Sequence, residues 1–156
     1  MKGYKALETG LVNRYGFQYE VGNTYILDGD LEWRKNGFHF CSYPEDTLRY
    51  VNGYNDNIVI VRVDGSGQII AYDDEYYGFY DMYASSIMKI LRVVPRKEVF
   101  NQIINSGVNR RIERFITLTK LSEEEKKIIL NMYPDIEPLI KYYQNEEYVL
   151  KRKRGY

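Results

Sequence analysis

Glycine-containing turn signals recur so closely before Pro95 that few helices can fit between them. They stand at Gly10, Gly16, Gly22, Asp28-Gly29-Asp30, Asn36-Gly37, Asn52-Gly53 and Asp64-Gly65-Ser66-Gly67. β-Branched and aromatic residues occupy several of the intervals, and such residues favour strands. We therefore predict short strands at residues 24–27, 37–40, 57–63 and 68–72.

The strand predicted at residues 57–63 carries apolar side chains on both faces, because isoleucines and valines alternate along it. We expect it to lie centrally in the sheet. The DGSG sequence at residues 64–67 predicts a hairpin turn between this strand and the next. A short helix is expected at residues 44–51, with Ser42 as N-cap and Pro44 in the first turn.

The composition changes near Pro95. Ten of the 12 glycines precede it, and residues 1–95 hold 9 basic and 13 acidic side chains against 13 and 9 in residues 96–156. Apolar residues in the second part recur at helical spacing. We therefore predict an α+β protein, with a mainly antiparallel, β-rich part at residues 1–95 and a part of about four helices with a basic tail at residues 96–156.

Three breaks divide the helical part into its predicted segments. Ser106-Gly107 ends the first segment, and Ser122 with Glu125 forms a capping box at the start of the third. Pro134 ends that third helix. A fourth stripe of apolar residues predicts one helix from about residue 135 to about residue 150.

The composition limits the cellular compartment in which we expect the protein. The apolar runs are shorter than the roughly 20 residues that span a bilayer, so we expect a soluble protein without membrane contact. A single cysteine, Cys41, excludes an intramolecular disulfide, and the first ten residues lack the apolar core of a secretory signal. We expect an intracellular location, in the host cytoplasm if the gene is viral.

The one histidine, His39, precedes Cys41 by two residues, so the two side chains share a face of the predicted strand. A catalytic Cys–His dyad is one interpretation, and a structural imidazole beside an inert thiol is the other. Neither a metal site nor a cofactor is expected. The DGDLE sequence is too short for an EF-hand loop, and no GK[ST] follows Gly65-Ser66-Gly67.

Two segments are candidate binding surfaces. Residues 73–83, DDEYYGFYDMY, have neither strand nor helix periodicity and predict a loop, whose aromatic residues form either a protein-binding patch or a lid over the core. The candidate binding residues are Tyr76, Tyr77, Phe79, Tyr80 and Tyr83. The basic tail, Lys151, Arg152, Lys153 and Arg154, forms either a nucleic-acid contact or a solvated helix end.

Four strings in the first 100 residues resemble one uncharacterised domain family of bacteriophages, prophages and large DNA viruses. They are KGYKAL, GFQYEVGNTY, NGFHFCSYPEDTLRYV and IMKILRVVPRKEV, in this order. The resemblance implies a viral or prophage context and supplies no activity.

A second resemblance concerns the glycine–aromatic strand and following short helix of the ADP-ribosyltransferase fold, which residues 37–50 resemble. It implies that Lys5 lies near the place of the basic residue on the first strand and His39 near the central motif. A later glutamate, which the sequence does not identify, would complete such a site. Lys5, His39 and Cys41 are thus the catalytic candidates.

Three functional hypotheses remain. The first is a small non-enzymatic viral or prophage accessory protein that binds a host or viral protein, for instance to inhibit host defence. The second is an enzyme, or degenerate enzyme, of ADP-ribosyltransferase-like architecture. The third is a nucleic-acid-associated factor that uses the basic C-terminal part. A concave pocket joining Lys5 to His39 favours the second over the first.

Overall fold

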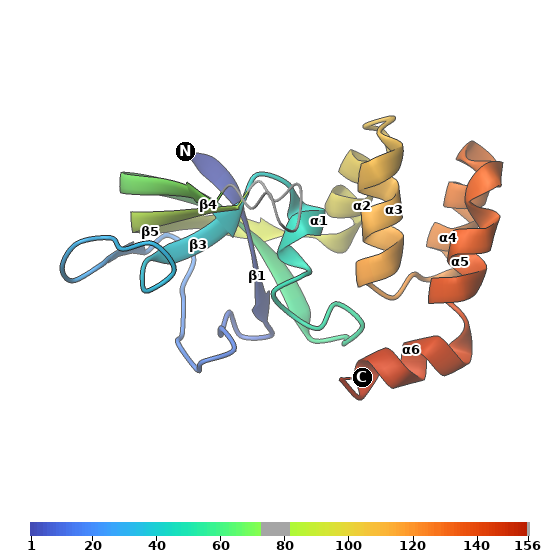
Figure 1. The fold of residues 1–156 in the computed structure, drawn as a ribbon, viewed down its shortest axis with the longest axis horizontal. Coiled ribbons are helices and arrows are strands. Elements are labelled where there is room, and N and C mark those ends of the chain that lie inside the picture. The colour runs from blue at the N-terminus through green and yellow to red at the C-terminus, as the bar shows by residue number, and fades with distance from the viewer. Residues whose placement is uncertain (73–81, 156) are drawn as a thin grey trace.

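The strands lie at one end of an elongated molecule and helices α2 to α6 lie at the other (Figure 1). The structure, a computed structural model, describes residues 1–72 and 82–155. The elements are β1 (Lys2–Glu8), β2 (Thr24–Ile26), β3 (Phe38–Cys41), α1 (Pro44–Thr47), β4 (Ile58–Tyr72), β5 (Met82–Val94), α2 (Arg96–Ile104), α3 (Asn109–Leu118), α4 (Glu123–Met132), the 3₁₀ turn η1 (Pro134–Ile136), α5 (Glu137–Tyr143) and α6 (Glu146–Lys153). The α+β class predicted from the sequence is confirmed.

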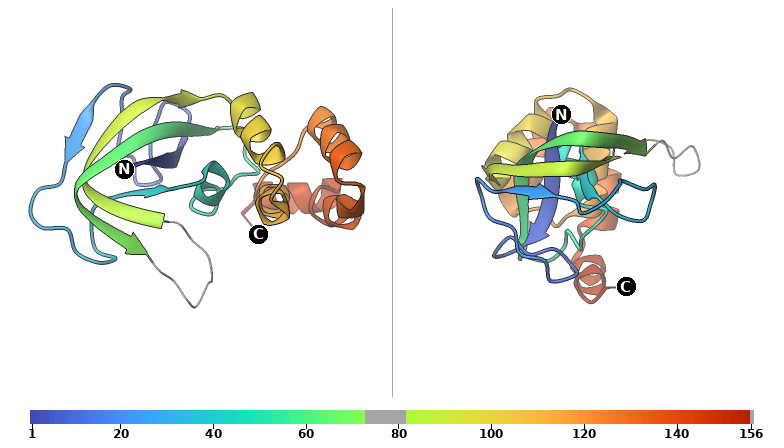
Figure 2. Two further views of the ribbon diagram at one scale, coloured as in Figure 1. Left: turned by 90° about the horizontal axis from the view of Figure 1, so that it is seen from above. Right: turned by 90° about the vertical axis from the view of Figure 1, so that its left-hand side faces the viewer.

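The five-stranded antiparallel sheet closes on itself. Its strand order is β2-β5-β3-β1-β4, and β4 also pairs with β5. The long β4 and β5 are strongly curved, and they wrap around the shorter strands (Figure 2). Because β4 has β1 on one side and β5 on the other, residues 58–63 are central, as predicted.

The hairpin predicted at residues 64–67 is wrong. The DGSG sequence lies inside β4, where the pairing with β5 shifts register between Ser66 and Ile69. Gly67 has φ +73°, which glycine adopts without strain, so the strand bends at a bulge and continues. Glycine-rich tetrapeptides occur both in turns that reverse the chain and in β-bulges. Here the strand bends at a bulge, and the glycine leaves room for the ring of Phe40. A Cβ on Gly65 would lie 2.5 Å from Cε1 of Phe40.

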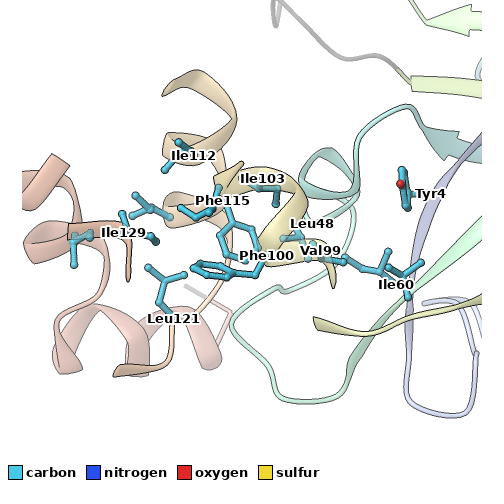
Figure 3. Packing of buried hydrophobic residues seen from close by; sticks show 14 residues of the cluster. Tyr4, Leu48, Ile60, Val99, Phe100, Ile103, Ile112, Phe115, Leu121 and Ile129 are labelled. Carbon is cyan, nitrogen blue, oxygen red and sulfur yellow. The ribbon is translucent and has the colours of Figure 1, made fainter. Parts of the chain in front are cut away.

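The closed sheet buries apolar residues on both sides. Inside it, Leu7, Tyr19, Phe40, Val61, Val63, Met88 and Ile90 form one cluster. Outside it, Tyr4, Ile60 and Val94 pack with the helices in a second cluster, seen from close by in Figure 3. Val99, Phe100 and Ile103 of α2 and Phe115 of α3 belong to this second cluster. The strands β1, β4 and β5 therefore each contribute to both cores.

The helical predictions hold except at two places. The capping box of Ser122 and Glu125 starts α4, as predicted. The single helix expected at residues 135–150 is instead η1, α5 and α6. α5 ends at Tyr143, and Asn145 is the N-cap of α6. The amide of Asn145 donates to the carbonyls of Lys141 and Tyr142 at the end of α5, and its side-chain oxygen accepts from the backbone N–H of Tyr148 in α6. The helix expected at residues 44–51 spans only four residues, and Tyr43 rather than Ser42 is its N-cap.

The segment predicted as a loop at residues 73–83 is only partly described. Residues 73–81 lie outside the described part of the chain. Met82 and Tyr83, in contrast, begin β5 and pair with Cys41 and Phe40 of β3, so the prediction is wrong for these two residues. Across the described ranges, no helix combines the length and apolar character needed to cross a membrane.

Two buried ion pairs fasten α1 to α3. Arg111 binds Glu45 through both carboxylate oxygens, and Arg114 binds Oδ1 of Asp46. Both carboxylates are buried, at 0% and 1% exposed. Burial raises the pKa of Asp46 although Arg114 opposes the shift, and its Oδ2 has no hydrogen-bond partner within the described residues. Removing either partner would thus leave a charge in apolar surroundings.

Gly65→Val tests the bend in β4. The new side chain would collide with Phe40, and we expect the free energy of unfolding to fall by about 3 kcal/mol in urea titrations. Ser66→Val, at the next and exposed position of the same strand, should change it by less than about 0.5 kcal/mol. Equal stability of the two variants would contradict the close contact.

Arg114→Met tests the fastening of α1. Because Asp46 stays buried without its partner, we expect a loss of about 3 kcal/mol or more. Lys97→Met, an exposed control on α2 that removes the same charge, should have little effect. The double variant Asp46→Leu/Arg114→Met should recover part of the loss, and a double variant as unstable as the sum of the single ones would contradict the pairing.

Candidate functional site

A cavity of about 770 Å³ opens beside β1, β3 and the end of β4, and we call it the basic pocket. Its basic lining residues are Lys5, Arg14, Arg34, Lys35 and Arg49, and its aromatic ones are Tyr15, Tyr19, Tyr50 and Tyr72. His39, Asn13 and Asn36 also line it. No aspartate or glutamate of residues 1–72 and 82–155 does so. The lining therefore suits an anion with apolar or aromatic parts.

A second cavity, of about 490 Å³, lies between the sheet and the helices but has a different character. At its wall, Glu125, Thr119 and the carbonyl of Lys120 already bind the guanidinium of Arg96. Much of the remaining lining is aliphatic, from β4, β5 and α2. The basic pocket, rather than this second cavity, is therefore the better candidate for a binding site.

Lys5 extends from β1 into the basic pocket. Its Nζ donates a hydrogen bond of 2.8 Å to the carbonyl of His39 and lies 5.8 Å from the ring centre of Tyr19. The pKa of Lys5 is lowered to about 8, mainly by burial; Cys41 opposes the shift and the positive charge of Arg14 adds to it. No carboxylate of the described residues is among the groups that shift this pKa. The ammonium is thus held by a backbone dipole rather than by a counter-ion.

His39 forms the other wall with Tyr72. Its Nε2 lies 3.1 Å from the hydroxyl of Tyr72, which accepts a 2.9 Å hydrogen bond from the backbone N–H of Arg34. Burial, Lys5 and Arg14 all lower the pKa of His39 below its usual value, so the imidazole is neutral at pH 7. Since the tyrosine oxygen already accepts from Arg34, its proton can be donated to Nε2. This chain of hydrogen bonds orients the imidazole.

The loop cations stand next to aromatic rings. The guanidinium carbon of Arg14 lies 4.8 Å from the ring centre of Tyr15, and that of Arg34 lies 5.6 Å from that of Trp33. Arg34 has φ +58°, which is uncommon for a side-chain-bearing residue and recurs at ligand sites. The charge of Lys35 is offset by Glu32, 3.0 Å away. The other cations that line the pocket are Lys5 and the three arginines.

The structure brings together two of the three catalytic candidates from the sequence. Lys5 and His39 meet in the basic pocket, and both also line, together with the buried Cys41, a small cavity of about 50 Å³ next to it, so only Cys41 is absent from the basic pocket itself. Of the five predicted aromatic binding residues, Tyr76, Tyr77, Phe79 and Tyr80 lie outside the described residues. Tyr83 is part of β5 and stacks on Phe40, with ring centres 5.7 Å apart.

The basic tail is part of α6 rather than a free end. Lys151, Arg152 and Lys153 belong to the helix and Arg154 is its C-cap. The carbonyl of Arg152 accepts a 2.7 Å hydrogen bond from the Asn52 amide, and its guanidinium lies over the buried ring of Tyr54. The tail is thus docked on the segment that follows α1.

The arginines of the pocket were not predicted from the sequence, although a signal exists. Arginine stands beside an aromatic residue in Arg14-Tyr15, Trp33-Arg34 and Arg49-Tyr50, and all three arginines line the pocket. Each dipeptide follows or lies within a turn region, where side chains can reach a common site. Repeated arginine–aromatic pairs in loops are therefore a usable indication of an anion site with stacking surfaces.

The model of a domain of unknown function (DUF7666) matches residues 1–101. The match includes every strand of the described residues and every residue that lines the basic pocket. No curated protein and no solved structure matches the chain.

The lowered pKa of Lys5 makes stability depend on pH. An unfolded lysine keeps its ordinary pKa of 10.5, whereas the folded one titrates at about 8. Between these two pH values the unfolded state binds more protons, so the free energy of unfolding rises with pH. We expect this rise in the native protein and its loss in Lys5→Met, measured as the difference between their urea midpoints at each pH. Parallel curves for the two proteins would show that Lys5 is solvated.

Proposed function

Because the chain belongs to the family of the domain of unknown function DUF7666, which brings no activity with it, we propose from the pocket itself that this domain binds a nucleotide. The observation that carries the proposal is the convergence of Lys5 and three arginines with tyrosine rings in one cavity whose described lining holds no carboxylate. A nucleotide offers the complementary pair of features, which are phosphate oxygens and a flat base.

The cations of the pocket would bind the phosphate of the nucleotide. Arginine donates to two phosphate oxygens at once, and lysine supplies a compact charge. Lys5 is partly buried, and the group that accepts its hydrogen bond is the uncharged carbonyl of His39. A phosphate beside Lys5 would supply the negative charge that this carbonyl lacks. It would also raise the pKa of Lys5 again.

Exposed tyrosine rings at the rim of the pocket would stack on the base of the nucleotide. Tyr15 is 79% exposed and Tyr50 is 39% exposed, although both line the cavity. Exposed tyrosine rings offer stacking faces to a base, whatever its identity. The volume of about 770 Å³ lies within the range of small-molecule sites, roughly 300–1,000 Å³.

Binding, rather than transfer of ADP-ribose, is the proposal. The sequence resemblance to ADP-ribosyltransferases requires a carboxylate, and the described pocket lining has none. Lys5 and His39 both line the basic pocket, so NAD belongs among the ligands to be tested. Consumption of NAD would make the enzymatic alternative the better one.

The viral or prophage accessory protein that binds a host or viral protein stays a prediction. Four of its five candidate residues fall at positions 76–80, outside the described residues, and Tyr83 is packed on Phe40. The basic pocket is compatible with such a context, since an accessory protein can act by sequestering a nucleotide.

Calorimetric titration tests the proposal. We expect ATP, ADP, AMP or NAD to bind at low ionic strength more tightly than inorganic phosphate, because the base adds stacking. Arg14→Gln and Lys5→Gln should each weaken binding about tenfold or more, the effect of losing one charged hydrogen bond. Lys89→Gln, an exposed change on β5 outside the pocket, is the control. Absence of binding, or equal affinities in all variants, would overturn the proposal.

A further inference from the structure

We propose that the ligand of this domain is single-stranded nucleic acid, whose chain continues from the basic pocket along an adjoining groove to the basic end of α6. This inference rests on the proposed nucleotide site and extends it. Its support is the continuity of two cavities, the docking of α6 at the far end, and the distribution of charge between them.

The basic pocket does not end at the first nucleotide. A neighbouring cavity of about 330 Å³ shares five of its lining residues, namely Ala6, Arg14, Arg49, Tyr50 and Val51. Arg14 and Arg49 thus stand on the common wall, where a phosphate between two successive nucleotides would lie. A site for a free mononucleotide has no need of this second compartment.

The second compartment leads to α6. Asn52 and Asn55 line it, and the amide of Asn52 holds the carbonyl of Arg152. The end of α6 accordingly lies beside the segment that follows α1 (Figure 1). The ring of Tyr54 lies under the guanidinium of Arg152, with 5.3 Å between ring centre and guanidinium carbon, and holds this cation against the segment that follows α1.

The charges along this path are mainly positive. Lys151 and Arg154 are exposed at the end of α6, and Arg14 and Arg49 are exposed in the middle. Acids lie on the path as well. Glu8 lines the second compartment, and Asp56 is 3.8 Å from Lys153. Among the described residues named here the cations outnumber the acids, and they lie at the shared wall and at the end of α6, so a polyanion is attracted at these two places along the path.

Single strands fit this path better than a duplex. Tyr15 and Tyr50 present rings beside the cations, and unpaired bases can stack on such rings while a paired base cannot reach them. The expected binding is weak in sequence preference and strong in salt dependence.

Fluorescence anisotropy with labelled oligonucleotides tests the inference. The probes are oligo-dT and oligo-U of about 12 nucleotides, a duplex of the same length, and a labelled mononucleotide, each at about 50 mM and about 200 mM salt. We expect the single strands to bind at least about tenfold more tightly than the mononucleotide and the duplex. Higher salt should weaken the single-strand complexes most, because they release the most counter-ions.

The variant that separates the two proposals is Lys151→Gln/Arg154→Gln, at exposed positions of α6 and its C-cap. It should weaken single-strand binding several-fold more than mononucleotide binding, whereas Lys89→Gln/Lys127→Gln, which removes two charges elsewhere, should not. Equal affinity for mononucleotide and single strand, with no effect of the α6 variant, overturns the inference and leaves the nucleotide site standing. If none of the probes binds, both proposals are overturned. Single-strand binding that survives Arg14→Gln unchanged, or equal binding of the duplex, also overturns the inference.

Discussion

The contact of Phe40 with two glycines is the constraint on which the closed sheet depends. Its ring lies where a Cβ on Gly3 or on Gly65 would be, with separations of 2.5 Å in both cases. β1 and β4 can therefore approach β3 only where they have no side chain. Because side chains alternate along a strand, Phe40 inside the sheet places His39 on the opposite face, where it meets Tyr72. Lys5 pairs with Val61 and so stands on the face of Phe40, from which its ammonium reaches the backbone carbonyl of His39. The packing of one ring thus sets the geometry of the pocket.

The helical part also contributes to the site, although no helix after α1 lines the basic pocket among the described residues. Arg111 and Arg114 of α3 form ion pairs with the carboxylates of α1. Arg49 and Tyr50 follow α1 by two and three residues. A four-residue helix has little stability of its own, so these ion pairs fix where the residues after it lie. Both arginines of α3 fall outside the residues that match the family model, which ends at residue 101. The family domain of this chain therefore depends on its C-terminal helices for the placement of two pocket residues.

Local signals predicted β2, β3, β4 and α1 to α4 but missed the strands β1 and β5, and long-range contacts explain the misread turn in β4. Helical periodicity and the capping box at Ser122 identify α2 to α4, because each depends on residues within a few positions. The DGSG sequence was misleading, since only the distant Phe40 decides between a turn and a bulge. For the site, Lys5 and His39 could be named as candidates from the sequence, and both line the basic pocket. Arg14, Arg34 and Arg49 could not, because three separate loops bring them together.

Burial of Lys5 connects these packing constraints to the proposed chemistry. A lysine whose ammonium is solvated would gain little from a phosphate, because water already stabilises its charge. Here burial lowers the pKa of Lys5 to about 8, because the folded chain solvates the ammonium less well than water does. An anion that enters the pocket replaces the missing water, so part of the free energy lost in burying Lys5 during folding is regained in binding. Partial burial of a cation without a carboxylate is destabilising for an isolated domain but favours binding of a phosphate-bearing ligand, and this is why Lys5, more than the exposed arginines, marks the basic pocket as a binding site.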